Sequence, residues 1–250
     1  MKVVAIIPAR YNSTRFQGKP LADICGRPMI WWVYNQVMKA KGISEVVVAT
    51  DDYRIAETCK KYGLKHIMTS ENCKTCTGRI YEASTKVDAD LYMSVNGDEP
   101  LIDPKLIEAI IPTENYNRDF YVSNLMTEMT SPAEVVDFTN IKVVTDADDN
   151  CMFMSRSPIP YPKGALDFKY YKHVGVMIYT KSALEFYNKT PRGRVERVED
   201  VDYIRFLEND KKVKMVEVEA HTLSVDTPKD LEVVKKVVEE KLLSGELKIN

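Results

Sequence analysis

The stretch IIPARYNSTRFQGKPL, residues 6–21, is the part of the chain that most constrains its fold and its chemistry. Its first residues belong to an apolar run that is typical of a buried strand. The following loop carries Arg10, Arg15 and Lys19, and Gly18 allows a close approach of the backbone. A turn between a strand and a helix also presents backbone N–H groups, so this loop favours an anion such as a triphosphate. The alternative is a solvated basic turn.

Short apolar runs and helical patterns alternate over the first 112 residues. Strands are expected at 3–9, 44–52, 65–70 and 91–100, the last running into a turn, and helices at 28–40, 53–63, 79–87 and 104–112. This alternation predicts an α/β fold with a mostly parallel, Rossmann-like sheet and helices on both faces. Ligands of such folds bind beyond the carboxyl ends of the strands, which directs attention to the loops after the first and fourth strands.

The pattern changes near residue 120. Strands separated by turns are expected within 121–129, 141–156 and 173–187, with a hairpin tip at DADDN (146–150), then a charged helix at 195–210, a strand at 214–220 and a helix at 228–243. Thr227 and Pro228 are typical of the start of that last helix. We expect one domain, residues 1–250, in which residues 120–200 form a mixed-strand extension.

Composition excludes several classes of function. The formal net charge is −2, whereas a nucleic-acid-binding protein usually carries a basic excess, so no nucleic-acid partner is expected. No apolar run approaches the roughly 20 residues of a membrane span, and the first residues enter a strand without a signal-peptide pattern. We therefore expect a cytoplasmic protein without a membrane partner.

The five cysteines are an odd number and suggest no disulfide framework. Cys73 and Cys76 form a CxxC pair, but a structural zinc site needs two further ligands and no second pair is present. Two thiols in a loop are the plain interpretation, and a redox or metal role is the alternative.

Two acidic residues far apart in the sequence suggest a metal site. Asp98 lies in NGDEP (96–100), beyond the fourth strand, and Asp226 lies in LSVDTPKDL (223–231), after an expected short strand. A carboxylate facing a triphosphate is repelled unless a divalent cation lies between them, and Mg²⁺ typically uses one or two carboxylates plus phosphate oxygens. Each residue also has a simple alternative, Asp98 as a turn residue and Asp226 as a helix cap.

Several segments, in order along the whole chain, resemble the 3-deoxy-manno-octulosonate (Kdo) cytidylyltransferase family, also called CMP-Kdo synthetases. They are IIPARYNSTRFQGKPLADICGRPMI, NGDEP, FMSRSPIPYP, KHVGVMIY, VERVEDVDYIRFLEND and SVDTPKDL. The resemblance implies a single α/β nucleotidyltransferase domain that forms a homodimer through its extension. It also implies transfer of CMP from CTP to an acidic sugar, with Mg²⁺ as cofactor and pyrophosphate as second product.

The resemblance further implies a set of site residues. Arg10, Lys19, Asp98 and Asp226 would be catalytic, and the two aspartates would bind Mg²⁺. The expected nucleotide-binding residues are Pro8, Ala9, Arg10, Ser13, Arg15, Lys19, Thr75, Thr77, Arg79 and Asp98, with cytosine between the first loop and residues 75–79. The expected acceptor-binding residues are Asn96, Arg156, His173, Met177, Asp202 and Tyr203.

The sequence departs from the family pattern at both ends of the site. The base segment usually reads Ser-Gly-Thr-Glu/Asp-Arg and reads TCTGR here, at 75–79. On the acceptor side Asn96 replaces a Gln, Met177 aligns with a Tyr, and Asp202 with Tyr203 replaces an acidic residue followed by Gln. CTP remains the expected nucleotide.

The retained acceptor residues favour an anion. Arg156 offers a fork for a carboxylate, and His173 can donate a hydrogen bond, although a surface ion pair and a structural histidine are the plain alternatives. Kdo is therefore the leading acceptor. An amino-Kdo, a nonulosonate, or a phosphonate or phosphate compound is the alternative, because a site built for one set of polar groups penalises another.

Two other functions compete with this interpretation. A catalytically silent homologue that binds nucleotide would explain the altered segments, although binding alone does not require the paired Asp98 and Asp226. A dehydrogenase is disfavoured because the first loop has no GxGxxG fingerprint, and it is not a Walker motif either.

Overall fold

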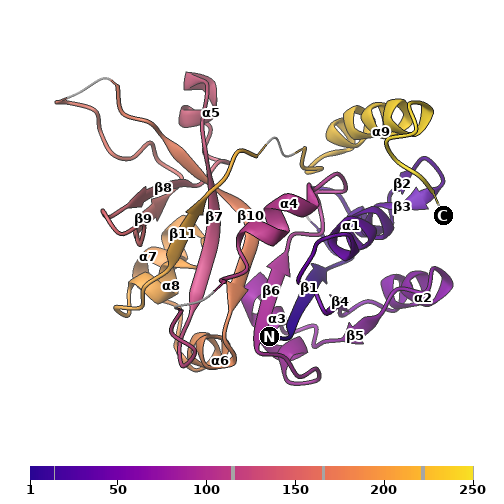
Figure 1. The fold of residues 1–250 in the computed structure, drawn as a ribbon, viewed down its shortest axis with the longest axis horizontal. Coiled ribbons are helices and arrows are strands. Elements are labelled where there is room, and N and C mark those ends of the chain that lie inside the picture. Colours follow the sequence, from indigo (N-terminus) through magenta and orange to yellow (C-terminus); the bar gives the residue numbers. More distant parts are fainter. Residues whose placement is uncertain (14, 114–115, 165–166, 221–222, 250) are drawn as a thin grey trace.

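The computed structural model describes residues 1–13, 15–113, 116–164, 167–220 and 223–249. Within these residues a nine-stranded sheet runs through the molecule, beside a two-stranded ribbon (Figure 1). The strands of the large sheet are β1 (Val3–Ala9), β4 (Glu45–Thr50), β5 (His66–Met68), β6 (Leu91–Val95), β7 (Val122–Glu128), β8 (Lys142–Thr145), β9 (Cys151–Ser155), β10 (Tyr171–Tyr179) and β11 (Lys214–Glu217). The ribbon consists of β2 (Asp23–Ile24) and β3 (Arg27–Pro28).

The order of the strands confirms the predicted α/β fold with a mainly parallel sheet. It reads β11-β7-β10-β6-β1-β4-β5, and β8 pairs with β10 and with β9. The pairs β6–β1, β1–β4, β4–β5 and β11–β7 are parallel, whereas β10 is antiparallel to both of its neighbours in that order. The antiparallel strand β10 therefore joins the extension to the parallel part within one sheet. That residues 1–250 form one domain stays a prediction.

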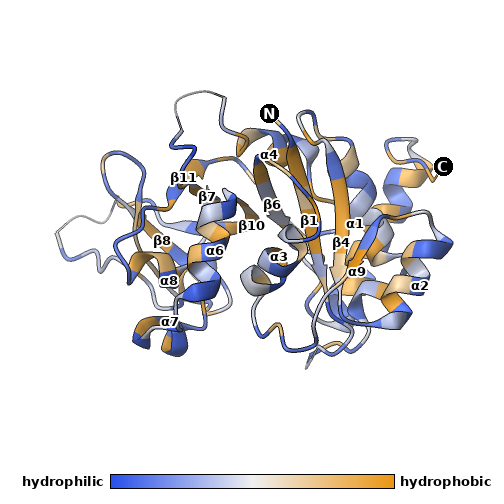
Figure 2. Cartoon of the chain, turned by 90° about the horizontal axis from the view of Figure 1, so that it is seen from below, coloured by the Kyte–Doolittle hydropathy of each residue, from blue (hydrophilic) through white to orange (hydrophobic). Residues whose placement is uncertain are grey.

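Helices cover both faces of the sheet, and its central strands are therefore buried on both sides. In β1, Val3, Ala5 and Ile7 belong to one hydrophobic core and Val4 and Ile6 to the other. The first core is covered by α1 (Met29–Met38), α2 (Tyr53–Lys61), α4 (Pro104–Ala109) and α9 (Pro228–Leu243), and the second by α3 (Cys76–Ser84), α6 (Lys181–Lys189) and α8 (Ile204–Leu207). Figure 2 shows apolar strands between these helices.

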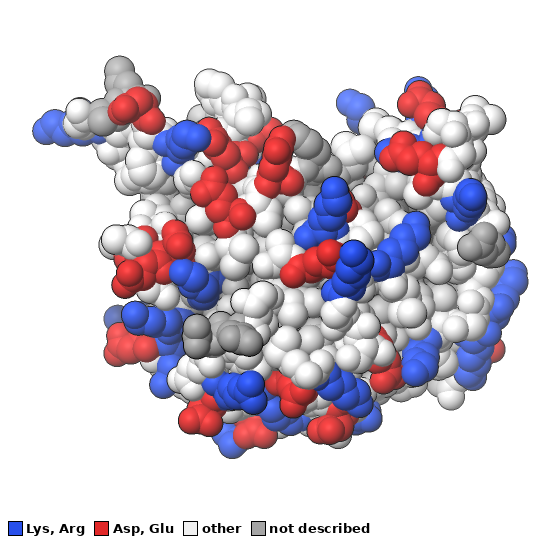
Figure 3. Space-filling model, in the orientation of Figure 1, with Lys and Arg blue, Asp and Glu red and all other residues white. Residues whose placement is uncertain are grey.

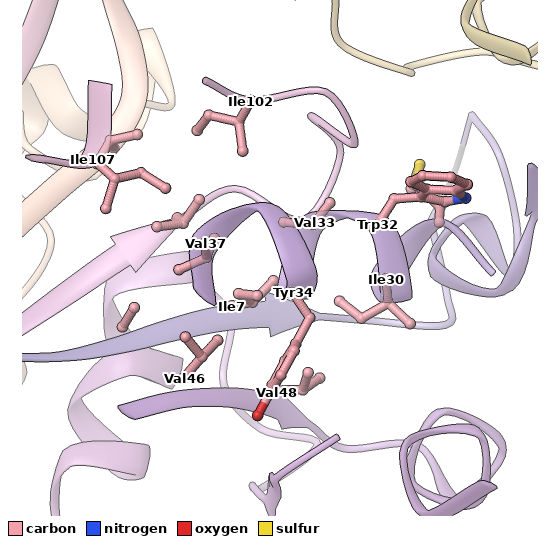
Figure 4. Close-up of a cluster of buried hydrophobic side chains, with 14 of the residues drawn as sticks. Ile7, Ile30, Trp32, Val33, Tyr34, Val37, Val46, Val48, Ile102 and Ile107 are labelled. Carbon is pink, nitrogen blue, oxygen red and sulfur yellow. The ribbon is translucent and has the colours of Figure 1, made fainter. Parts of the chain in front are cut away.

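Helix α1 anchors the first core. Figure 4 shows Val33, Tyr34 and Val37 of this helix among Ile7 of β1 and Val46 and Val48 of β4. Eight of its ten residues are buried, so the helix is packed on nearly all sides rather than along one stripe. The basic loop lies in the connection between β1 and α1. This connection therefore ends at a well-packed helix.

Three sequence-based assignments were wrong. The end of the segment 173–187 is not a strand, because α6 begins there with Thr180 as its cap and buries Ala183, Leu184 and Tyr187. The expected helix at 195–210 is two helices, α7 (Arg194–Glu199) and α8, since Asp200 adopts a left-handed conformation with φ of 51°.

The third error concerns the segment before Asp226. No strand is present at residues 223–225, where a single backbone hydrogen bond of 2.9 Å joins the Val225 N–H to the Asp98 carbonyl oxygen. Helix α3 also begins at Cys76, three residues earlier than expected. Three predictions of detail were correct: the hairpin tip at 146–150 between β8 and β9, Thr227 as the cap of α9, and Pro228 as its first residue.

Two short helices complete the fold, namely the 3-10 helix η1 (Lys19–Leu21) and α5 (Pro132–Val136). A search of the described helices finds none that combines the length and the apolar character of a membrane-spanning segment. Basic and acidic side chains are interspersed over the face shown in Figure 3.

Candidate active site

The basic loop follows β1 and turns back on itself. The backbone N–H groups of Ser13 and Gly18 both donate to the Tyr11 carbonyl oxygen, at 3.1 and 2.8 Å. Gly18 has a φ of 70°, and a Cβ at this position would lie 3.2 Å from the Tyr11 ring. A side chain at position 18 would therefore be strained twice, by its backbone conformation and by this contact. The turn places Lys19 near the carboxyl ends of the parallel strands.

Lys19 joins the two acidic residues that are remote from each other in sequence. Its Nζ lies 2.9 Å from Oδ2 of Asp98, 3.6 Å from Oδ1 of Asp226 and 2.9 Å from the Val225 carbonyl oxygen. All three groups are only partly exposed to solvent. Because both carboxylates contact one ammonium group, they lie at the same point of the sheet edge, where two carboxylates could share a divalent cation.

Two arginines extend this charged cluster. The guanidinium of Arg15 lies 3.0 Å from Oδ1 of Asp226, and the Arg15 side chain is 60% exposed, so this ion pair can exchange partners readily. Arg10 lines the same cavity and makes no ion pair with another described residue. Both side chains are therefore available to an incoming anion.

These groups surround a cavity of about 480 Å³. Eleven predicted site residues line it, namely Pro8, Ala9, Arg10, Ser13, Arg15, Lys19, Thr75, Arg79, Asn96, Asp98 and Asp226. The lining also includes Asn12, Pro20, Cys76, Gly97 and Asp200, none of which was among the predicted site residues. Gly97 could have been found from the sequence, because it precedes Asp98 in the NGDEP turn. In the structure a Cβ at this position would lie 3.1 Å from the Pro8 carbonyl oxygen.

The first turn of α3 forms the wall opposite the basic loop. Thr75 caps the helix, with its side chain accepting from the Gly78 N–H at 3.1 Å. The Arg79 guanidinium is buried and is committed to Asp51, at 2.6 Å, and to the Thr69 hydroxyl. Arg79 therefore fixes this wall, and any contact with the nucleotide would come from a side chain already held in place.

Thr77 does not line the cavity. It is buried, and its backbone N–H donates to the Asp202 carboxylate at 3.1 Å. Asp202 thus satisfies a free N–H at the start of α3, and its burial raises its pKa. A nucleotide-binding role for Thr77 and an acceptor-binding role for Asp202 stay predictions.

A second, smaller cavity of about 200 Å³ adjoins the first. The two cavities share Asn96, Asp98 and Asp226 in their linings, so they meet at the carboxylates that contact Lys19. The smaller one is otherwise lined by Glu99, Thr139, Asn140, Ile141, Lys172, His173, Val174, Gly175 and Ser224. Of the predicted acceptor residues it contains Asn96 and His173.

A bulge in β10 shapes this smaller cavity. The register with β7 shifts between Val174 and Met177, and the buried Asn124 amide donates to the Val174 and Val176 carbonyl oxygens at 2.9 and 2.8 Å. Gly175 lies at the bulge, where a Cβ would come within 2.7 Å of Asn96 Cγ. The glycine therefore makes the space that the Asn96 side chain occupies.

The remaining acceptor candidates lie outside both linings. Met177 and Tyr203 are packed in the second hydrophobic core. Arg156 uses its guanidinium on backbone carbonyl oxygens, of Glu199 at 2.7 Å, Phe138 at 3.1 Å and Asp200 at 3.3 Å. Each of its three nitrogens thus donates one hydrogen bond within the protein. The acceptor-binding role of Arg156 stays a prediction, as it does for Met177 and Tyr203.

Two ionisable groups of the smaller cavity have shifted pKa values. Burial, followed by the charge of Asp98, raises the pKa of Glu99 to about 8. Burial, followed by the charge of Arg156, lowers the pKa of His173 to about 4. Burial thus favours the neutral form of both side chains, and each can act as a hydrogen-bonding group.

The cysteines do not form a thiolate site. Burial raises the pKa of Cys73 to about 11 and that of Cys76 to about 12. The Cys73 Sγ contacts Glu82 at 3.1 Å, and the Cys76 Sγ contacts the Ser94 hydroxyl at 3.7 Å. Among the described residues no group of three or more His, Cys, Asp or Glu is suited to a metal ion, so the pair Asp98 and Asp226 would need further ligands from a substrate.

Comparisons with known proteins agree on one family. A family model described as cytidylyltransferase matches residues 4–249. An 8-amino-3,8-dideoxy-manno-octulosonate cytidylyltransferase from Shewanella sediminis is 41% identical over 93% of this chain and 97% of that protein. A 3-deoxy-manno-octulosonate cytidylyltransferase from Escherichia coli is 37% identical over 96% of this chain and 98% of that protein.

Solved structures show the same relationship. A CMP:2-keto-3-deoxy-manno-octonic acid synthetase in complex with CTP has a TM-score of 0.90 and 37% identity, covering 96% of this chain and all of that chain. An inositol-1-phosphate CTP transferase from T. maritima, at 15% identity and a TM-score of 0.69, shares the fold, and covers 95% of each chain. The similarity thus covers both cavities and the extension.

Proposed function

Because the chain belongs to the cytidylyltransferase family, we propose that it transfers CMP from CTP to 3-deoxy-manno-octulosonate (Kdo) or to the 8-amino analogue of this acid. Pyrophosphate would be the second product. The observation that carries this proposal is the contact of Asp98 and Asp226 with one lysine at the sheet edge, in a chain that matches a CTP-bound synthetase over 96% of its length.

The larger cavity fits the nucleotide. Arg10, Arg15 and Lys19 present three positive charges on one loop, and the first turn of α3 forms the opposite wall. A triphosphate needs charge neutralisation more than covalent chemistry, so fixed cations are the main contribution the protein can make. Arg15 would exchange its ion pair with Asp226 for a phosphate oxygen, since this pair is exposed and weak.

The donor set at the junction of the cavities fits Mg²⁺. Asp98 and Asp226 offer carboxylate oxygens only, which are the ligands that this ion prefers, and substrate phosphates would complete the set. These two residues would hold the ion, and when bound it supplies neutralisation of the phosphate charge. Lys19 now occupies the space between the carboxylates and would contact a phosphate oxygen instead.

The chain's own residues position the two substrates. The anomeric hydroxyl oxygen of the acceptor forms a bond to the α-phosphorus, and the bond from that phosphorus to the bridging oxygen of pyrophosphate breaks. The acceptor hydroxyl proton is released, and pyrophosphate leaves with the bonding electron pair. Lys19 and Arg10 stabilise the charge that develops on the phosphates, and holding both substrates in line supplies the rest of the acceleration.

Kdo is the leading acceptor and its 8-amino analogue is the second candidate. Relatives with either name match nearly the whole chain at 37–41% identity. Both acids fit the smaller cavity in chemical type, because Lys172 there suits a carboxylate and the polar groups around it suit hydroxyls.

Pyrophosphate release tests the proposal directly. Purified protein is incubated with CTP, Mg²⁺ and one acid at a time, including Kdo, 8-amino-Kdo, a nonulosonate and a small phosphonate. Release with Kdo or its amino analogue well above the rate without acceptor is the expected result. Release only with another acid would replace the acceptor, and CTP binding without release with any acid would indicate a silent homologue.

The extension offers a surface for a second copy. Large apolar side chains are exposed on it at Val136, Phe138, Met152, Tyr161 and Phe168. We expect a homodimer through this surface. Light scattering of Phe138→Glu against wild type would check it, and an unchanged mass in the variant, or a monomeric wild type, would contradict it.

A further inference from the structure

Glu99 is a buried acidic side chain that the reaction described above does not use. Its side chain is only 6% exposed, and its Oε2 has no hydrogen-bond partner among the described residues. The backbone around it is well held, because the Asp98 carbonyl accepts from Val225 at 2.9 Å and the Glu99 carbonyl accepts from Ile102 at 3.1 Å. These hydrogen bonds fix the backbone position of Glu99.

Glu99 differs in this respect from the other buried charged side chains. Arg79 pairs with Asp51, Glu196 with Arg205, and Lys142 donates to the Asp137 and Asn140 carbonyl oxygens. Each of these groups recovers the cost of losing water by bonding within the protein. Within the described part of the chain, the Glu99 side chain makes no hydrogen bond or ion pair that would recover this cost.

The carboxyl group lies beside the acceptor cavity rather than in the apolar core. Glu99 lines the smaller cavity together with His173, whose Nδ1 is also buried without a partner. Lys172 lies close enough for its charge to act on Glu99. Two buried polar atoms thus lack partners around one space, which begins at the carboxylates that contact Lys19.

We infer that Glu99 is a specificity-determining residue, which binds a proton-bearing group of the acceptor, a hydroxyl or an ammonium group, other than the hydroxyl that attacks CTP. This inference rests on the proposed function for the identity of the two candidate acids. A carboxyl group accepts hydrogen bonds from either kind of group, and an anionic group of the acceptor would instead be drawn to Lys172. Such a contact would use the polar atom that the fold leaves unsatisfied.

Two variants at position 99 and one control variant at position 57 test the inference with both acids. Glu99→Leu removes hydrogen bonding, Glu99→Gln keeps it without a possible negative charge, and Glu57→Leu on the exposed surface of α2 is the control. The measurements are KM for Kdo and for 8-amino-Kdo at saturating CTP, KM for CTP, and the melting temperature with and without each acid.

In Glu99→Leu we expect KM to rise at least tenfold for the preferred acid, while KM for CTP stays within about twofold. The melting temperature without acid should be unchanged or higher, because an unpartnered polar group becomes apolar. Rescue by Glu99→Gln would identify a hydroxyl as the group bound. A rise in KM in Glu99→Gln that is confined to 8-amino-Kdo would identify the ammonium group as the group bound.

Two results would overturn the inference, and they differ from failure of the proposed function. Unchanged KM for both acids in Glu99→Leu, with an active wild type, removes the contact alone. A lower melting temperature in Glu99→Leu together with unchanged KM assigns Glu99 a structural role. If the wild type neither turns over nor is stabilised by either acid, the proposed function fails and the inference fails with it.

Discussion

The two adjoining cavities differ in how their polar groups are satisfied. In the larger cavity Lys19 and Arg15 already form ion pairs with Asp98 and Asp226, in contact with solvent. In the smaller cavity Oε2 of Glu99 and Nδ1 of His173 are buried and have no hydrogen-bond partner among the described residues. The larger cavity can thus exchange internal partners for a ligand, whereas the smaller one gains partners only when a ligand arrives.

This difference indicates that the larger cavity binds the triphosphate and the smaller one selects the acceptor. An exposed ion pair such as that of Arg15 with Asp226 rearranges at little cost and suits a triphosphate group, which carries the same charges in every nucleoside triphosphate. Buried unsatisfied groups discriminate strongly, because a wrong ligand leaves them unpaired. Substitutions in the larger cavity should therefore affect CTP and the rate, and substitutions in the smaller one should affect the acceptor.

The largest effect is expected for Lys19→Met. Loss of the ammonium group removes a fixed charge at the phosphates and leaves Asp98 and Asp226 without their shared partner. We expect kcat to fall about 10²- to 10³-fold. Steady-state pyrophosphate release measures it, with Lys60→Met on the exposed surface of α2 as control. A loss of less than about threefold would show that the phosphates are neutralised elsewhere.

The second prediction concerns stability and pH. The pKa of His173 is about 4 in the folded chain and ordinarily about 6.5, so the unfolded chain takes up this proton first as the pH falls. The lowered pKa of His173 therefore contributes to the free energy of unfolding. This contribution is fully present above pH 6.5 and is lost as the pH falls towards 4, which amounts to about 3 kcal/mol. Urea denaturation at pH 7 and pH 4 should show a smaller loss for His173→Gln than for His66→Gln. Equal losses would contradict burial of the imidazole.

Gly175→Ala should separate the two cavities. The added Cβ would lie within 2.7 Å of Asn96 Cγ and displace this side chain from the junction. We expect KM for the acceptor to rise about tenfold with KM for CTP nearly unchanged, since the cost of overpacking is about 1–3 kcal/mol. Gly164→Ala is the matched control, because nothing lies within 4 Å of its added Cβ. An equal rise in both KM values would argue against separate cavities.

Arg15→Gln should have the smallest effect. The guanidinium is largely exposed, and exposed charge pairs contribute about 0.2–1 kcal/mol. We expect KM for CTP to rise no more than about fivefold, and the effect should shrink in high salt. Arg194→Gln on the exposed surface of α7 is the control. A hundredfold rise would make Arg15 a principal phosphate ligand.

The parallel part of the sheet was predictable because its signals are local. Apolar runs and helix caps gave β1, β4, β6 and α1 within a few residues, and the charged turns placed Lys19 and Asp98 at one edge. The contact with Asp226 followed from the chemistry of a metal site. Its local structure was mistaken, since one hydrogen bond from Val225 replaces the expected strand.

The acceptor side was less predictable because its arrangement depends on tertiary contacts. The occupation of Arg156 by three backbone carbonyl oxygens, and the capping of α3 by Asp202, leave no trace in local sequence. Glu99 was visible within NGDEP, and Lys172 within KHVGVMIY. Neither could be recognised as a cavity residue without the pairing of β10 with β6 and the bulge in β10, which are tertiary features.

Calorimetric titration of CTP, with Mg²⁺ and with EDTA, tests the central claim that Asp98 and Asp226 act as one metal site. We predict that Mg²⁺ tightens CTP binding about tenfold or more in the wild type and in an Asp88→Asn control, but much less in the double variant Asp98→Asn, Asp226→Asn. The same tightening in all three proteins would contradict the account.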